Sequence, residues 1–391
     1  MYKKHVLKNG KLYFAMIILT AAGLCLKMPV NSQASVNIAV NESVFPEETL
    51  RKKAASFDRN KDGMLSKSEI KKVKSLSIVK FLDPDDAPED GKAPVYEKSD
   101  FTFDFQGIEH FTSLKKLEIN LSSGITKKEG KHYNSVLFHF DEVYKLKNLT
   151  HFKLYSAKQK NIDLSKLPKL KSVILSVPNL SNLTIRNNDL KKFRLESSTS
   201  KMKSLDFQDA PNLTTLYLSN MQSTNMIFGE KNTFLQEMNI EGNGKTKIKF
   251  FDITHLENLK KLLLKKINIS NIDFSKNINL EDVYVDTCSM ETLDFSKNEK
   301  LKWVACEGKK TKEIIIPENN IISTFKWVNA NLDTFENEYL NPDTLTSIIL
   351  FNNPIQSLDL TRYENLSLVF VDKDVNVQLA PGLDPNEIVT H

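Results

Sequence analysis

The sequence predicts an α/β repeat protein, a solenoid of about 10–12 short coils with extended segments on both faces and a small helical cap at the N-terminal end. Three observations lead to this prediction. An apolar pattern, L-x-x-L-x-L, returns at short intervals from about residue 111 onward. A second, alternating pattern returns within the same interval, and one short helical segment precedes both.

The first pattern sets the length of each coil. Between Leu149 and Leu301 its copies start 20 to 24 residues apart. One unit of this length cannot bury its own leucines, whereas stacked units bury them in a continuous core. An array of amphipathic helices is disfavoured, because the 1-4-6 spacing does not continue with a period of 3.6. Clear copies start at Leu114, Leu149, Leu170, Leu190, Leu213, Leu235, Leu259, Leu280 and Leu301, and looser copies start at Ile322, Leu345 and Leu366.

The second pattern predicts another extended segment in each coil. It alternates apolar and polar residues, which is typical of a short strand. Each period then holds two extended segments and two tight turns, and little room is left for a long helix. The copies are IDLSKL (162–167), LDFQDA (205–210), IDFSKN (272–277), LDFSKN (293–298) and LDLTRY (358–363).

Together these patterns resemble the leucine-rich repeat family over roughly residues 101–380, and the short period with LDFSKN is similar to the bacterial 21-residue class. The resemblance implies a solenoid with apolar residues in both halves of each coil. Extracellular bacterial members of the family are often adhesins or ligand-binding surface proteins. The family's inward asparagine, nine residues into each period, is present here only at Asn243 among eight periods, so the asparagine ladder is expected to be mostly missing.

The first 34 residues have the layout of a secretory signal peptide. Lysines precede an apolar run from Leu12 to Leu26, and cleavage is expected after Ala34. A retained N-terminal anchor is the alternative. Removal of residues 1–34 leaves 49 basic and 49 acidic residues, so the charge gives no indication of nucleic-acid binding. We expect a secreted or cell-surface monomer with no membrane span after cleavage.

Four further segments follow the signal peptide in the predicted organisation. A helical cap spans 35–82, an acidic, proline-rich linker spans 83–100, the solenoid spans 101–380 and a tail spans 381–391. The interval from Leu114 to Leu149 is 35 residues long, and its surplus is either a surface loop or hairpin or an excursion that binds a partner.

The segment FDRNKDGMLSKSE, residues 57–69, matches the calcium-loop pattern D-x-[DN]-x-[DN]-G-x5-E. Gly63 occupies position 6, where a sharp turn is needed. The segment resembles an EF-hand over about residues 46–77, and a polar turn between two helices is the alternative. The resemblance implies Ca²⁺ ligands at positions 1, 3, 5, 7, 9 and 12, which are Asp58, Asn60, Asp62, Met64 (through its carbonyl), Ser66 and Glu69.

The flanks of this loop predict two helices. The first covers 46–57 with Pro46 in its first turn, and the second starts with Ser66 and Glu69 as a capping box. EF-hands usually occur in pairs, so we expect the first coil (103–114) to act as the partner of this single one. Calcium would then be structural, with sensing as the alternative, and its affinity would be on the order of 10⁻⁴–10⁻³ M. The cap residues expected to pack on that coil are Phe57, Ile70, Val73 and Leu76.

The residues between the leucines of each L-x-x-L-x-L segment are expected to point outward on one face. In the later coils several of them are aromatic or aliphatic, and aromatic residues are the usual anchors of interfaces. Flanking loops or the tail could cover them. The candidate partner-binding residues are Tyr217, Tyr284, Trp303, Ile349, Phe351 and Phe370.

Motifs for catalysis are missing from the sequence, which contains no H-E-x-x-H, no G-x-S-x-G and no phosphate loop. Cys288 and Cys306 fall at inward positions of neighbouring coils, and we expect buried thiols rather than a disulfide. The sequence therefore predicts a non-enzymatic binding protein that recognises an extracellular protein or glycan, for example in adhesion. The alternative is a glycan hydrolase with an unrecognised site on the solenoid.

Overall fold

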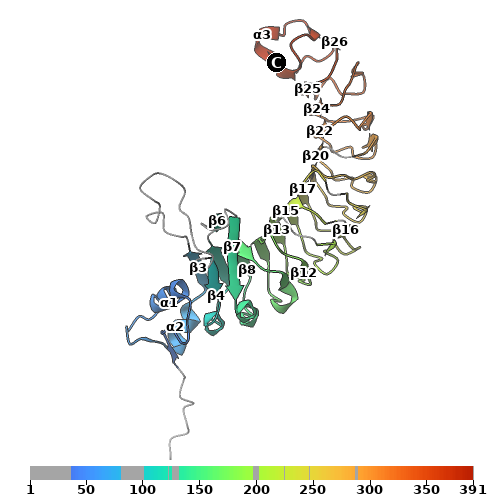
Figure 1. Cartoon of the computed structure of the whole chain (residues 1–391). Helices are drawn as coiled ribbons and strands as arrows, with labels where there is room; N and C mark the ends of the chain where they lie inside the picture. Colours follow the sequence, from blue (N-terminus) through green and yellow to red (C-terminus); the bar gives the residue numbers. More distant parts are fainter. Residues whose placement is uncertain are drawn as a thin grey trace, which may run out of the picture. The chain divides into compact units, whose positions relative to one another are not determined.

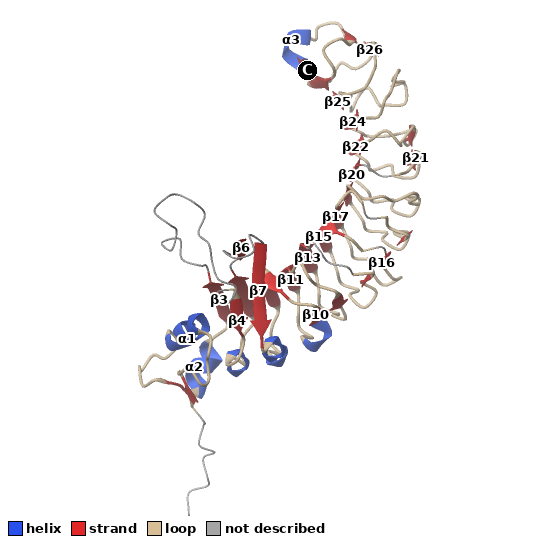
Figure 2. Ribbon diagram, in the orientation of Figure 1, coloured by secondary structure: helices blue, strands red, loops and turns tan. Residues whose placement is uncertain are grey.

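The structure, a computed structural model, describes residues 37–80, 101–121, 123–125, 132–196, 202–223, 225–245, 247–286 and 289–390 (Figure 1). The predictions for the signal peptide (1–34), the linker (83–100) and Cys288 lie outside these residues. Strands and loops make up most of the described chain, and helix is confined to a few short segments (Figure 2).

One parallel sheet of fourteen strands runs through the described chain, and its strands are neighbours in the order of the sequence. Successive coils therefore stack, and the predicted solenoid is confirmed, with about 11 coils. The strands are β3 (Ser75–Lys80), β5 (Lys116–Leu121), β8 (His151–Tyr155), β11 (Ser172–Ser176), β13 (Lys192–Glu196), β15 (Thr215–Met221), β17 (Glu237–Gly242), β19 (Lys261–Lys265), β20 (Asp282–Asp286), β22 (Trp303–Glu307), β24 (Thr324–Val328), β25 (Ser347–Ile349), β27 (Leu368–Phe370) and β29 (Val389–Thr390).

The leucines of the first pattern form the core. In β19, Leu262 and Leu264 are buried, while Lys261, Leu263 and Lys265 are more exposed, as alternation along a strand requires. Leu213, Leu259 and Leu280, which precede their strands, are fully buried. One continuous cluster of apolar side chains extends from the helical segment to the last coils, so each coil is stabilised by burial against its neighbours.

Shorter sheets form where the second pattern lies. Four of its five copies contribute strands, and residues 272–277 do not. The aspartate of the pattern closes the following turn, as in Asp294, whose Oδ1 accepts a hydrogen bond from Ser296 N at 2.9 Å. These sheets pair β10 (Asn161–Asp163) with β12 (Asn182–Thr184), β14 (Ser204–Asp206) with β16 (Asn225–Ile227) and β18 (Phe250–Phe251), β21 (Thr292–Asp294) with β23 (Glu313–Ile315), and β26 (Ser357–Leu360) with β28 (Asn376–Leu379).

An asparagine column does connect the coils, but at a position that the sequence analysis did not consider. In each case the side-chain Nδ2 of a buried asparagine, three residues before the first leucine of a coil, donates to two carbonyls of the preceding coil. Asn298, for example, donates to Phe274 O at 3.1 Å and Asn277 O at 2.8 Å. This column is distinct from the family's ladder at position nine, where the sequence has asparagine only at Asn243 among eight periods. The column comprises Asn187, Asn232, Asn277 and Asn298.

Two helices flank the loop at the N-terminal end, α1 (Glu48–Ala55) and α2 (Lys67–Lys72). Ser66 caps α2, and Glu69 returns a hydrogen bond to the Ser66 backbone, so the predicted capping box is present. Helix α1 begins two residues later than its predicted start at Pro46, because the Glu47 side chain caps it by accepting from Thr49 N.

The helical segment packs against the first coil, as predicted. Phe57 meets Phe111 edge-on with ring centroids 5.8 Å apart, and Phe45 lies 6.2 Å from the same ring. Gly107, with φ of +96°, allows the backbone to approach Phe45 closely. The chain then enters the main sheet through β3, so the sheet begins inside the segment 35–82 that was assigned to the cap. A short antiparallel strand pair also holds the loop. Strand β1 (Ile38–Ala39), which precedes α1, pairs with β2 (Met64–Leu65), which lies within the loop.

The surplus after Leu114 contains an antiparallel hairpin of β6 (Ser123–Ile125) and β7 (His132–Phe138). Strand β7 also pairs in parallel with β4 (Thr102–Asp104) and β9 (Ala157–Lys158). Among the described residues, three short 3-10 helices lie at Ile108–His110, Phe140–Lys145 and Leu164–Lys166, and α3 (Pro385–Ile388) precedes β29. Within the described ranges, every helix is too short or too polar to cross a membrane.

Candidate functional site

The loop between α1 and α2 is closed by its own carboxylates. Gly63, whose φ of +79° permits the sharp turn, donates its N–H to Asp58 Oδ2 at 2.8 Å. Asp62 Oδ1 accepts from Met64 N at 2.8 Å, and Asp62 Oδ2 accepts from Asn60 Nδ2 at 2.8 Å. The predicted ligand residues therefore lie on one continuous turn in which backbone amides hold the acidic side chains in place.

Glu69 closes the other side of the loop. Its Oε2 accepts from Ser66 Oγ at 2.7 Å and Ser66 N at 2.9 Å, and its Oε1 accepts from Arg59 N at 2.7 Å. The bonds from Ser66, followed by the bond from Arg59, lower the pKa of Glu69 to about 2. Because these bonds outweigh the effect of burial, Glu69 is ionised at neutral pH, and its buried carboxylate lies between the two ends of the loop.

Two observations fit a bound cation at this loop. Asp58 Oδ1 is buried and has no hydrogen-bond partner, which leaves a negative oxygen unsatisfied. The donor set consists of carboxylate, amide, hydroxyl and carbonyl oxygens, which are the ligands that Ca²⁺ prefers. One observation does not fit. Among the residues that the structure describes, no three acidic, histidine or cysteine side chains converge closely enough to form a metal site.

A second candidate site is a groove on the exposed face of the main sheet, with a volume of about 510 Å³. It crosses β15, β17, β19, β20 and β22. Tyr217 and Leu263 supply apolar surface from the middle of their strands, and Trp303 stands at one end. Charged side chains border it, and Lys261 and Asp282 form an ion pair of 2.9 Å. The lining residues are Thr215, Leu216, Tyr217, Glu237, Met238, Asn239, Lys261, Leu262, Leu263, Asp282 and Trp303.

Trp303 is held beside the groove by Tyr284. The two rings are stacked, with centroids 6.0 Å apart and an interplanar angle of 14°. Tyr284 OH donates to Glu307 Oε2 at 3.0 Å, and Lys326 lies over the Tyr284 ring at 5.5 Å. Burial, together with the Glu307 carboxylate, raises the pKa of Tyr284 well above its usual value. Tyr284 therefore stays neutral and keeps a fixed ring against which Trp303 rests.

The other three predicted residues form a separate apolar patch near the C-terminal end. Ile349 and Phe370 are direct neighbours in β25 and β27, and the rings of Phe351 and Phe370 lie 4.7 Å apart. Ala305 and Lys326 occupy the same row between this patch and Tyr284. The predicted outward apolar column is therefore divided into two parts, and all six residues are half-buried rather than fully exposed.

Tyr217 is partly covered, because the Arg194 guanidinium lies 4.1 Å from the centre of its ring. Sequence reasoning did not single out this contact, Asn239, or the ion pair at the rim. The signal was available, since these residues occupy the same outward positions of the repeat as the aromatic ones. Cys306 is a buried free thiol whose pKa burial raises to about 11, as expected for a packing residue.

Comparison with solved structures places this fold among leucine-rich repeat proteins. The chain is similar to an internalin (inlF) from Listeria monocytogenes, with a TM-score of 0.50 and 16% identity, over 90% of this chain and all (100%) of that one. This likeness shows a leucine-rich-repeat fold. The functional domain of InlJ from Listeria monocytogenes aligns with a TM-score of 0.49 and 16% identity over 89% of this chain and 78% of that one. A leucine-rich repeat protein of Leptospira interrogans aligns with a TM-score of 0.45 and 14% identity over 82% of this chain and 93% of that one. No protein-family model and no curated protein matches the sequence.

Proposed function

We propose that this chain is a secreted or cell-surface binding protein that recognises an extracellular protein or glycan through the exposed face of its main sheet. The observation that carries the proposal is the groove beside Trp303. Fold alone does not determine function in a repeat family, so it is the chemistry of this surface that supports the proposal.

The groove has the composition of a recognition surface. Apolar and aromatic side chains lie at its centre and charged side chains lie at its rim, which is the usual anatomy of a specific interface. Because Tyr284 supports the Trp303 ring from one side, little side-chain entropy is lost when a partner packs on the other side. An aromatic ring held in this way suits both a protein side chain and the apolar face of a sugar.

Replacement of Trp303 by alanine tests the proposal. We expect the Trp303→Ala variant to lose at least about tenfold in affinity for any partner found, because central aromatic anchors dominate binding energy. The measurement is a screen of the secreted chain against immobilised glycans and extracellular proteins, followed by titration of each hit.

The matched control is Phe234→Ala, which removes an exposed aromatic side chain from a turn outside the strands. A partner whose affinity is unchanged by Trp303→Ala but reduced by Phe351→Ala would move the site to the C-terminal apolar patch. A partner unaffected by both variants would refute recognition through the sheet face.

We further propose that the loop from Asp58 to Glu69 binds Ca²⁺ and that the ion stabilises the N-terminal end of the solenoid. The unsatisfied, buried Asp58 Oδ1 supports this proposal. Asp58, Asn60, Asp62 and Ser66 would supply side-chain oxygens, Met64 its carbonyl and Glu69 its carboxylate. Since Phe57 at the start of the loop packs on Phe111 of the first coil, an ordered loop would also order that contact.

Calcium removal gives a direct test. With the expected weak affinity, about 10 mM Ca²⁺ should stabilise the chain by about 1.4 to 2.7 kcal/mol relative to chelator, because the ion binds only the folded state. Glu69→Gln should abolish this difference in thermal melts. The control Glu48→Gln changes an exposed carboxylate on α1, paired with Lys52, and should keep it. A Glu69→Gln variant with full calcium stabilisation would place the ion elsewhere.

A further inference from the structure

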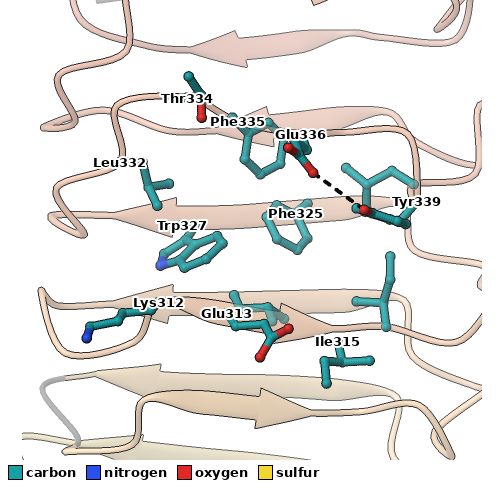
Figure 3. Close-up of a pocket in the computed structure, with 13 residues that line it drawn as sticks. Lys312, Glu313, Ile315, Phe325, Trp327, Leu332, Thr334, Phe335, Glu336 and Tyr339 are labelled. Atoms are coloured by element: carbon teal, nitrogen blue, oxygen red, sulfur yellow. Dashed lines mark hydrogen bonds between the residues drawn. The ribbon is translucent and has the colours of Figure 1, made fainter.

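A second groove, on the side of the coils that carries the short sheets, has a volume of about 500 Å³ (Figure 3). It lies between β23 and the segment 332–340 of the next coil. Several neighbouring coils on this side pair as short strands, but the segment 332–340, like residues 272–277, contains no strand. The interval from Ile322 to Leu345 is also two residues longer than the intervals on either side of it.

The groove is open because the segment 332–340 is bonded to the coil that follows it. Asn337 Nδ2 donates to Asp359 O at 2.7 Å, Tyr363 OH donates to Asn337 O, and Arg362 Nη1 donates to Glu338 O at 3.2 Å. These bonds draw the middle of the segment away from β23. Only its end, where Asn320 Nδ2 donates to Tyr339 O at 2.8 Å, is bonded to the coil before it.

Strand β23 therefore has an unpaired edge. Glu313 N donates to Glu291 O and Ile315 O accepts from Phe295 N, so both residues direct their backbone groups toward β21. The N–H and C=O of Ile314 then point the opposite way, into the groove, because alternate residues of a parallel strand bond to opposite sides. Among the described residues no strand pairs with this edge.

The floor of the groove also contains an unsatisfied donor. Trp327 is only 7% exposed, lines the groove, and its indole Nε1 has no hydrogen-bond partner. In Figure 3 its ring lies between Leu332 and the strand that carries Glu313. A buried indole N–H without an acceptor costs free energy, and an arriving carbonyl would remove that cost. Phe325 and Phe335, whose ring centroids are 5.5 Å apart, make the floor beside it apolar.

Two acidic side chains and one basic side chain, Lys312, border the opening. Glu313 and Glu336 both line the groove, both are exposed, and neither forms an ion pair within the part of the chain that the structure describes. Their nearest polar contacts are hydroxyl groups of Thr292 and Tyr339. A ligand with a basic group would therefore be attracted to this rim.

We propose that this groove binds an extended peptide of another protein as an added strand on β23. The peptide's backbone pairs with Ile314, one of its carbonyls accepts the Trp327 indole N–H, an apolar side chain rests on the aromatic floor, and a basic residue meets Glu313 or Glu336. Strand addition of this kind uses main-chain hydrogen bonds for affinity and side-chain pockets for specificity. The site is separate from the groove on the main sheet.

The test uses a fluorescein-labelled peptide, KTLTFSK, which is residues 292–297 with Asp294 replaced by threonine and a lysine placed in front. This sequence has the alternation that pairs at the same position of regular coils. We expect saturable binding with a Kd below about 1 mM, measured by fluorescence polarisation. In a Trp303→Phe background Trp327 is the only tryptophan, so its emission should change with the same binding curve.

Two comparisons make the test specific. Methylation of every second backbone amide can begin at either of two neighbouring residues of the peptide, which gives two forms. Only one of these forms removes the N–H groups that would face β23. That form should bind at least about tenfold more weakly, while the other retains affinity. Trp327→Phe should weaken binding about fivefold through loss of one hydrogen bond. Trp303→Phe, outside the groove, should leave affinity unchanged.

Three results would overturn the proposal. The first is no saturable binding of the peptide. The second is equal binding of both methylated forms, which would exclude strand addition. The third is a Trp327→Phe variant that binds the peptide no more weakly than the parent chain. That result would mean that no peptide carbonyl accepts the indole N–H.

Discussion

Asn298 connects two coils with one amide group, and it illustrates what single residues contribute to this solenoid. Its Nδ2 satisfies two buried carbonyls at the turn of the preceding coil. Phe274 O also accepts from Asn277 N and Asn277 O also accepts from Leu280 N, so the Asn298 amide gives each carbonyl its second hydrogen bond. The same role is repeated by Asn277, whose Nδ2 donates to Ile253 O and Leu256 O. The asparagine column thus holds the turns in register while the leucines supply the bulk of the core.

Removal of this amide should be costly. We expect Asn298→Ala to lower the free energy of unfolding by about 1–3 kcal/mol, because two buried carbonyls each lose one of their two hydrogen bonds. Urea denaturation followed by circular dichroism measures the change. Asn279→Ala is the matched control, since Asn279 donates to Glu257 O at an exposed position where water can replace it. Equal losses in the two variants would contradict the role assigned to the buried column.

The column could have been predicted, because asparagine recurs three residues before the first leucine in NNDL, NTFL, NINL and NEKL. The family's asparagine lies at position nine, so comparison with the family alone does not detect this pattern. In the calcium-like loop the sequence predicted the ligand residue types. It also predicted the bond from Ser66 N to Glu69, as part of the capping box, but not the bond from Arg59 N, which depends on how α2 is placed against the loop.

At the scale of elements, the strands were the most predictable part of the fold. Residues at positions 4 and 6 of each L-x-x-L-x-L segment are buried in strands such as β13 and β19. Strand β3 was assigned to the cap because residues 75–80 lack the leading leucine of the pattern. Its pairing with β5 is a tertiary contact that no local pattern reports. The division of the outward aromatic residues into two parts arose from Ala305 and Lys326, which interrupt the row.

The contact between the helical segment and the first coil gives a prediction at this scale. A Cβ on Gly107 would lie 2.3 Å from Phe45 Cδ1 and 2.7 Å from Val44 O, and φ is +96°. Gly107→Ala should therefore destabilise the chain through both strain and overlap, by about 1–3 kcal/mol more than a variant with strain alone.

Gly244→Ala supplies that comparison, since Gly244 has φ of +78° and open space around its Cα. Thermal melts of the two variants give the difference. Similar melting temperatures would mean that Phe45 and its neighbours shift easily, and that the helical segment is not tightly joined to the first coil.

At the scale of the whole molecule, stability depends on neighbouring coils rather than on contacts between distant parts. Each strand of the main sheet pairs only with the strands of the adjacent coils. A coil is therefore an exchangeable unit, provided that its removal leaves the pattern in phase. This follows from the same short period that identified the fold in the sequence.

Deletion of residues 280–300, which is 21 residues, should leave a folded chain with a slightly lower melting temperature. The deletion joins Asn279 to Leu301 and preserves both the leucine pattern and the spacing from Asn277 to the next leucine. Removal of residues 280–289 alone breaks the phase and should produce a partly unfolded chain. Circular dichroism and limited proteolysis distinguish the two. A 21-residue deletion that unfolds the protein would refute independent coils.

The main sheet passes through all fourteen strands without a break, whereas the described short strands form four separate ladders, β10-β12, β14-β16-β18, β21-β23 and β26-β28. Under a pulling force, resistance between two such ladders comes mainly from the main sheet, because strand hydrogen bonds that would share the load are missing on the other side. The molecule therefore has built-in compliant points where one short ladder ends and the next begins.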